Sequence, residues 1–185
     1  MTNDRKFEWI DNAPAVCVSV VIGATDDEAC AVIGRPHDIE FASLRGAADW
    51  VSGGYPRFWY ATGTVENVSF VWEENGFRGA DRDVADALPS SAAFASVYWN
   101  VNSLSAFTFA RSGEVVTQFE ILWAPNEEEW QSLVAAGAER VTDGEWKAAP
   151  WERALILQSQ VSGSATVAHP SWLELPGVRF WGASF

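Results

Sequence analysis

Hydrophobic residues fill both sides of one segment early in the chain. Residues 15–22 read AVCVSVVI, which is apolar at nearly every position and rich in β-branched valine. A strand that is buried on both faces has this pattern. A Thr-x-x-Glu capping box then begins at Thr25, and apolar residues follow at helical spacing up to Gly34. This order predicts a central strand followed by a short helix.

The next part of the chain alternates between weak and strong patterns. Glycine and proline interrupt the segment after Gly34, so we expect mostly loop there, with at most a short helix over residues 38–44. Residues 58–62 and 65–72 are strand candidates on either side of Gly63, and they predict a hairpin. The following EENGFRG stretch predicts a loop, because Asn-Gly supplies the positive φ angles of a tight turn.

Alternation with a period of two marks three further strands in the middle of the chain. They cover residues 94–101, 106–111 and 114–122, and Ser112-Gly113 supplies the turn between the last two. A short helix is expected before them, over residues 81–88. Consecutive strands joined by short turns indicate a meander, so the sheet is expected to be mostly antiparallel.

Two helices and an aromatic tail complete the chain. Asn126 caps the first helix, with Glu129 three residues later and Gly137 at the end. The second helix begins near Pro150, since proline is tolerated at the first helical position. The tail over residues 162–185 mixes Gly, Ser and Pro with aromatic residues, so we expect it to be irregular but packed against the body.

These elements predict an α+β fold in a single domain. We expect a mostly antiparallel sheet of about 5–6 strands with about 3–5 helices packed on it. Residues 15–138 would form the core of the domain, and residues 139–185 would add a helix and the aromatic-rich C-terminal tail.

The charge of the chain narrows the classes of partner. It has 185 residues, with 12 Lys and Arg against 25 Asp and Glu, for a formal net charge of −13. No cluster of basic residues suits nucleic acid, whose phosphates need Lys and Arg. No apolar run approaches the roughly 20 residues of a membrane span, and no leader segment is recognisable, so we expect a cytoplasmic protein. An acidic surface would attract a basic protein partner.

Residues for catalysis or metal binding are scarce. The two cysteines, Cys17 and Cys30, are expected to be free thiols, and His37 and His169 are the only histidines. No C-x-x-C or H-x-x-x-H spacing occurs, so no metal site is expected. No G-x-S-x-G elbow or phosphate-binding loop is present either. We therefore assign no catalytic residue and no cofactor.

Two features remain as candidates for binding. Glu73 and Glu74 form an acidic pair, but neighbours on a strand point to opposite sides, so we expect a turn with solvated charges. Tryptophan is abundant, at 11 of 185 residues. Trp72, Trp99 and Trp130 fall on apolar faces and are expected in the core. Some of the others could line a groove, because Trp is enriched at binding hot spots.

Four segments in a fixed order carry a family resemblance. They read VSVVIGATDDEACAVIG, FVWEENGFRG, VYWNVNSLSAFTFARSGEVVTQFE and PNEEEWQSLVAAGA. In this order the chain resembles an actinobacterial family, the domain of unknown function 6461, over about two-thirds of its length. The resemblance implies an α+β fold and no particular activity.

The sequence thus favours a cytoplasmic, non-catalytic binding protein, of an immunity type or a protein-interaction module, for a basic partner. One alternative is an enzyme or carbohydrate-binding domain that uses an aromatic cleft with Glu66, Glu73 or Glu74 as its carboxylate. Another is a structural subunit of a larger assembly. The candidate binding residues lie at the ends of two predicted strands and are Trp72, Glu73, Glu74, Asn75, Trp99, Asn100 and Asn102.

Overall fold

The computed structural model describes residues 7–33, 39–52, 57–65, 67–164 and 170–184. Its strands are β1 (Val16–Ile22), β2 (Ile39–Phe41), β3 (Arg57–Val65), β4 (Val68–Glu74), β5 (Ala93–Trp99), β6 (Ser105–Arg111), β7 (Glu114–Phe119) and β8 (Arg179–Ser184). Its helices are α1 (Asp26–Ile33), α2 (Leu44–Val51), α3 (Asp83–Ala87), α4 (Glu127–Ala135), α5 (Asp143–Ala148) and α6 (Pro150–Ser162). Short 3₁₀ helices are η2 (Ile10–Asn12), η3 (Arg78–Ala80) and η5 (Pro170–Glu174).

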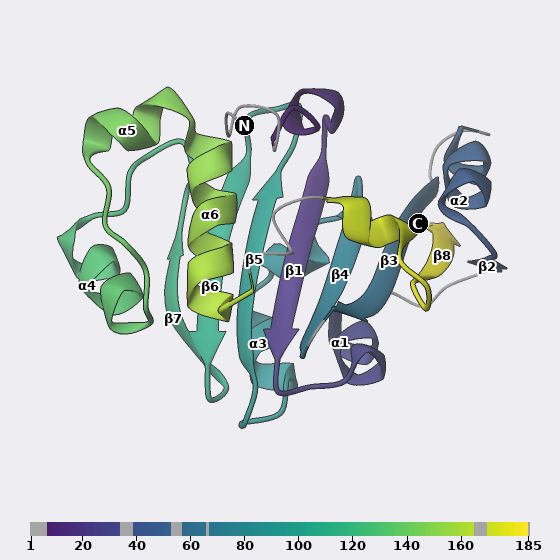
Figure 1. The fold of residues 1–185 in the computed structure, drawn as a ribbon, viewed down its shortest axis with the longest axis horizontal. Helices are drawn as coiled ribbons and strands as arrows, with labels where there is room; N and C mark the ends of the chain where they lie inside the picture. The colour runs from purple at the N-terminus through teal and green to yellow at the C-terminus, as the bar shows by residue number, and fades with distance from the viewer. Residues whose placement is uncertain (1–6, 34–38, 53–56, 66, 165–169, 185) are drawn as a thin grey trace.

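All of these strands join one eight-stranded sheet in the order β2-β8-β3-β4-β1-β5-β6-β7 (Figure 1). Every pair of neighbours is antiparallel. The predicted α+β class and antiparallel sheet are confirmed, but the expected number of strands is too low. No helix in the described part of the chain is both long and apolar enough to cross a membrane.

The predicted central strand is β1, which pairs with β4 on one side and β5 on the other. Val18 and Val20 face one side of the sheet, whereas Cys17 and Val21 face the other, and all four are buried. Each face is covered by a separate layer, as the apolar run requires. The two predicted helix N-caps are also present. Thr25 and Glu28 form a capping box at the start of α1, and Asn126 and Glu129 form one at the start of α4.

Helix α6 covers one face of the sheet, and α1 and α3 cover the other (Figure 1). Pro150 opens α6 as predicted, and Gly163 ends it in the left-handed conformation. Gln158, which is fully buried, donates from Nε2 to the carbonyl oxygens of Val18 at 2.7 Å and Ala95 at 3.0 Å. This side chain attaches the helix to both central strands.

The predicted turn and helix in the first half are misplaced. Gly63 lies inside β3, so the hairpin does not turn there, and β4 begins only at Val68. The glycine is needed because the ring of Phe70 packs against it from the paired strand. In place of a helix over residues 38–44, Ile39–Phe41 form β2, while Asp38 lies outside the described residues. Helix α2 starts at Leu44, after Ser43 has capped it.

The described part of the C-terminal tail is less irregular than expected, because it contains η5 and a strand. Its last described residues form β8, which inserts between β2 and β3, so the end of the chain completes the sheet. The sequence pattern did not predict this strand, because its six residues include Gly182 and no β-branched side chain and so give a weak strand signal. It also missed α5, although Thr142 and Glu145 form a capping box at its start.

Gly182→Ala is expected to lower stability, because a Cβ at this position would lie 2.7 Å from Phe41 and 2.9 Å from the Trp50 ring. Overpacking of this kind costs about 1–3 kcal/mol. Urea denaturation measures the change. Gly144→Ala is the matched control, because nothing lies within 4 Å of its Cβ position. Equal stability of the two variants would contradict the packing of β8 against α2.

Candidate functional site

Three connections meet at one end of the sheet and enclose a hollow. Val16 pairs with both Glu74 and Trp99, and Trp99 pairs with Ser105, so the chain leaves β4 and turns from β5 to β6 at the same end. The end of β7 lies beside the start of β6, because Phe119 pairs with Phe107. The hairpin-end hollow has a volume of about 600 Å³. Its lining includes the polar residues Asn75, Tyr98, Asn100, Asn102 and Glu120 and the apolar residues Phe77, Val101 and Leu104.

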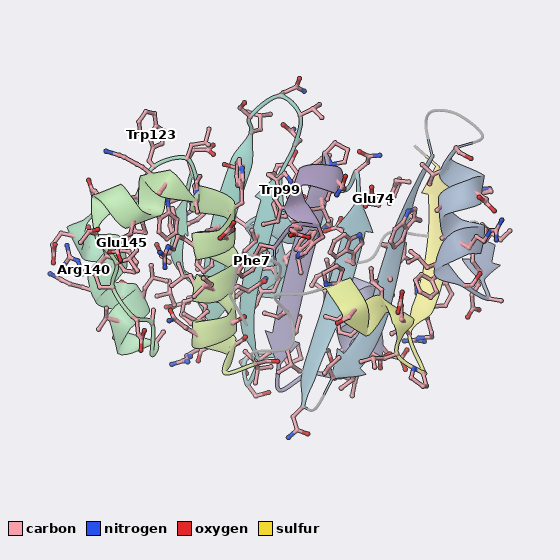
Figure 2. The ribbon with its side chains drawn as sticks, turned by 45° about the horizontal axis from the view of Figure 1, so that its top comes forward. Phe7, Glu74, Trp99, Trp123, Arg140 and Glu145 are labelled. Carbon is pink, nitrogen blue, oxygen red and sulfur yellow. The ribbon has the colours of Figure 1, made fainter. Side chains whose placement is uncertain are left out.

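The candidate binding residues separate into three groups. Trp72, Glu74 and Trp99 lie on the face that α6 covers, and Figure 2 shows Glu74 and Trp99 near this end of the sheet. Glu73 lies on the opposite face, since it is next to Glu74 on the strand. Only the three asparagines, Asn75, Asn100 and Asn102, line the hollow.

The two tryptophans form part of a group of four aromatic rings that pack at tilted angles. Trp9 lies between them, with ring centroids 5.3 Å from Trp72 and 5.7 Å from Trp99. Trp151 follows at 5.8 Å from Trp99. Trp72 and Trp99 are 5% and 4% exposed, so they belong to the core, as their apolar faces indicate. The Nε1 atom of Trp99 donates to the carbonyl oxygen of Ala13 at 2.8 Å, which holds the N-terminal segment against the sheet.

Glu74 is largely withdrawn from water on this aromatic face. Its Oε2 atom accepts a hydrogen bond of 3.3 Å from Nε1 of Trp72. Burial raises the pKa of Glu74, and the bond from Trp72 offsets only part of that rise. The predicted solvated turn is therefore wrong for this residue.

The prediction is also wrong for Glu73, which is only 2% exposed. Its carboxylate accepts hydrogen bonds from the backbone N–H groups of Arg78 at 2.9 Å and Gly79 at 2.7 Å. These bonds fold the loop after β4 back onto the sheet. The approach is so close that a Cβ on Gly79 would meet the side chains of Cys17 and Ser19.

Burial raises the pKa of both cysteine thiols. Both are free, as predicted, and Cys17 is fully buried. Burial, and to a lesser degree the Glu73 carboxylate, raise the pKa of the Cys17 thiol well above its usual value. A raised pKa keeps the group as a thiol, which is the weaker nucleophile.

Asn100 builds the loop that forms one wall of the hollow. Its Oδ1 atom accepts hydrogen bonds from the N–H groups of Asn102 at 2.9 Å and Leu104 at 3.1 Å. Its Nδ2 atom donates to the hydroxyl of Tyr98 at 2.8 Å. Asn75 forms the turn after β4. Its backbone adopts a φ of 58°, the positive angle that the predicted tight turn requires.

Glu120 is the acidic group of the hollow, and the sequence analysis missed it. Its Oε2 atom accepts a bond of 3.4 Å from the N–H of Ser105. Its Oε1 atom is buried and has no hydrogen-bond partner among the described residues. Glu120 lies two residues after Gln118, so the period of two along β7 predicts that both side chains lie on the same face. This alternation was the signal in the sequence that could have identified Glu120. Tyr98 and Phe77, whose rings lie 6.3 Å apart, were also missed.

The described residues include no group of three or more His, Cys, Asp and Glu side chains that could hold a metal ion. His37 and His169 both lie outside these residues, as does Glu66.

Glu73→Gln is expected to lower the free energy of unfolding by about 1–3 kcal/mol, because one of two buried N–H groups would face an amide N–H₂ instead of an oxygen. Urea denaturation measures the loss. Glu74→Gln is the control one position away, because it removes no backbone partner. A Glu73 variant as stable as the native protein would show that the carboxylate does not hold the loop.

Glu74→Gln is expected to change how stability depends on pH. Because the folded protein raises the pKa of Glu74, stability is highest below the unfolded value of about 4.3 and falls as pH rises toward the folded value. The glutamine variant lacks this decline, so it should gain stability relative to the native protein between acidic and neutral pH. Unfolding free energies measured from pH 4 to 8 test the sign; a difference that does not vary with pH would contradict it.

Comparison with known proteins adds a family but no activity. Neither a curated protein nor a solved structure matches the chain significantly. A family model matches residues 7–136. This range includes β1, Glu120 and the four strands whose ends surround the hollow, β4, β5, β6 and β7. The matched region extends over well over half of the chain, and the chain therefore belongs to the family of unknown function DUF6461.

Proposed function

We propose that this protein is a non-catalytic binding protein that holds a basic protein partner at the hairpin-end hollow, as an immunity or protein-interaction module would. The observation that carries this proposal is a group of exposed apolar side chains around a carboxylate. Val101 is 73% exposed, Leu104 58% and Phe77 42%, and all three line the hollow with Glu120. Single exposed apolar residues are ordinary, but several of them gathered beside polar residues are typical of an interaction surface.

Another exposed apolar side chain follows Glu120 closely in the chain. Trp123 is 69% exposed and projects from the segment after β7 (Figure 2). The backbone N–H of Trp123 donates to the carbonyl oxygen of Glu120 at 3.1 Å. The turn that carries the tryptophan therefore starts at the acidic residue of the hollow. Exposed tryptophan is the residue type most enriched at interface hot spots.

The net charge of −13 supports a basic partner. A negative protein attracts a positive one over a distance of about one Debye length and so speeds their encounter. The apolar group would then supply the short-range contact that keeps the partner bound.

The alternative of a sugar-binding or enzymatic cleft keeps one supporting observation. The amides of Asn75 and Asn102 and the rings of Phe77 and Tyr98 line the same hollow, and such groups also suit a sugar. Of the carboxylates named for this alternative, however, Glu73 and Glu74 lie on opposite faces of the sheet and do not line the hollow, and Glu66 lies outside the described residues. We therefore prefer a protein partner and treat a sugar as an outcome of the test.

The test uses purified basic proteins encoded beside the gene for this chain, with binding followed by surface plasmon resonance. One of them is expected to bind, with an association rate that falls about tenfold or more from 50 to 500 mM salt. The double variant Val101→Ser/Leu104→Ser should weaken the complex about tenfold or more, because it removes central apolar contacts.

Leu175→Ser is the matched control, since Leu175 is 44% exposed but lines a different hollow, beside α2 and β8. Equal weakening by the control and by the double variant would contradict the assignment of this surface. Binding of a sugar array in place of any basic protein would favour the alternative.

A further inference from the structure

Glu120 presents an unusual problem for a folded protein. Its Oε1 atom is buried without a hydrogen-bond donor among the described residues, and a carboxylate oxygen in that position loses its hydration without compensation. Such a group is uncommon in native structures and calls for a missing donor, which can be a water molecule or a ligand. Glu120 is half-buried and lines the hairpin-end hollow, so a ligand there reaches the side chain, although Oε1 itself points away from solvent.

No lysine or arginine of the described residues lines the hollow to serve as that donor. Arg78 follows Phe77 in the chain, but its guanidinium bonds to Asp81 at 3.1 Å and Asp83 at 2.7 Å. The Ser105 N–H reaches the other oxygen of Glu120 at 3.4 Å, which is long for a bond to a charged acceptor. Since the terminal torsion of a glutamate is soft, the carboxylate can rotate toward a better donor.

The groups around Glu120 match the features of an arginine side chain. Asn75 and Asn102 add amide oxygens to the lining, and a guanidinium carries five N–H donors in one plane to reach several acceptors. Phe77 and Tyr98 supply aromatic rings, on which a guanidinium stacks favourably. Exposed Val101 and Leu104 would pack against the apolar part of the side chain.

We propose that the hairpin-end hollow receives one arginine side chain of the basic partner, with the Glu120 carboxylate as its counter-ion. This inference rests on the proposed function and makes it more specific, because it names the group that is recognised. The three acceptor residues lie in different connections: Asn75 after β4, Asn102 between β5 and β6, and Glu120 after β7. The arginine site therefore forms only when the chain is folded.

The experiment is a titration of ¹⁵N-labelled protein with N-acetyl-arginine methylamide, followed by amide chemical shifts. We expect saturable binding at millimolar concentration, with shifts at Asn75, Asn102 and Ser105. The citrulline analogue is the matched ligand, because it has nearly the same shape and no charge. It should bind at least tenfold more weakly, and equal binding of the two ligands would overturn the proposal.

Glu120→Gln should weaken arginine binding at least tenfold. Glu114→Gln is the control at the opposite end of β7, since it makes the same charge change at an exposed position outside the hollow. Equal loss in both variants would indicate a general charge effect and overturn the assignment to Glu120. If the Glu120 variant fails to fold, the comparison of arginine with citrulline on the native protein still decides the question. Tighter binding of the lysine analogue would also overturn the choice of arginine.

The inference and the proposed function can fail separately. If the Val101→Ser/Leu104→Ser variant loses the protein partner while Glu120→Gln retains it, the binding surface is right and the arginine receptor is wrong. If neither variant changes the affinity for the partner, the surface itself is wrong.

Discussion

A single buried carboxylate, that of Glu73, holds the loop on which this end of the protein depends. A carboxylate that leaves water must recover its hydrogen bonds, and here the recovery comes from the N–H groups of Arg78 and Gly79. A second side chain acts on the same loop, because Nε2 of Gln118 donates to the carbonyl oxygen of Ala80 at 2.9 Å. The loop between β4 and α3 is therefore fixed from β4 and from β7, and Asn75 and Phe77 keep their places at the rim of the hollow.

The same constraint explains why two adjacent glutamates have different roles. Alternation along β4 sends Glu73 beneath the loop and Glu74 into the tryptophan group on the other face. Each carboxylate is largely removed from water, yet the sheet separates them, so they cannot divide acid and base roles at one substrate. The feature that looked most like an active site in the sequence is thus two separate structural contacts.

Sequence reasoning worked where the signal is local. The valine-rich run of β1, the capping box of α4 and the turn at Ser112-Gly113 each depend on neighbouring residues, and each was placed correctly. It failed where partners are distant in sequence. Gly63 was predicted to lie in a turn. A glycine is needed there because the ring of Phe70 packs against it, and this contact with the paired strand is not visible in the local sequence. Strand β8 was missed because its pairing with β2 and β3, which lie far earlier in the chain, determines its conformation.

The candidate site was only half predictable for the same reason. Asn75 was identified from the chemistry of the Asn-Gly turn, and Asn100 and Asn102 from their place at the end of a predicted strand in a segment that resembles the family. Glu120 joins them only through the register of β6 with β7.

The hairpin that carries the exposed apolar residues is held by hydrogen bonds within the hairpin itself. Asn100 bonds to the backbone at Asn102 and Leu104, and Ser103 is held at a φ of 60°, in the left-handed region. A loop ordered in this way has already lost most of its conformational entropy when the protein folds. A partner that binds Val101 and Leu104 would not have to order them, so more of the contact energy remains for affinity. This internal order, rather than exposure alone, distinguishes the hairpin from an ordinary surface loop.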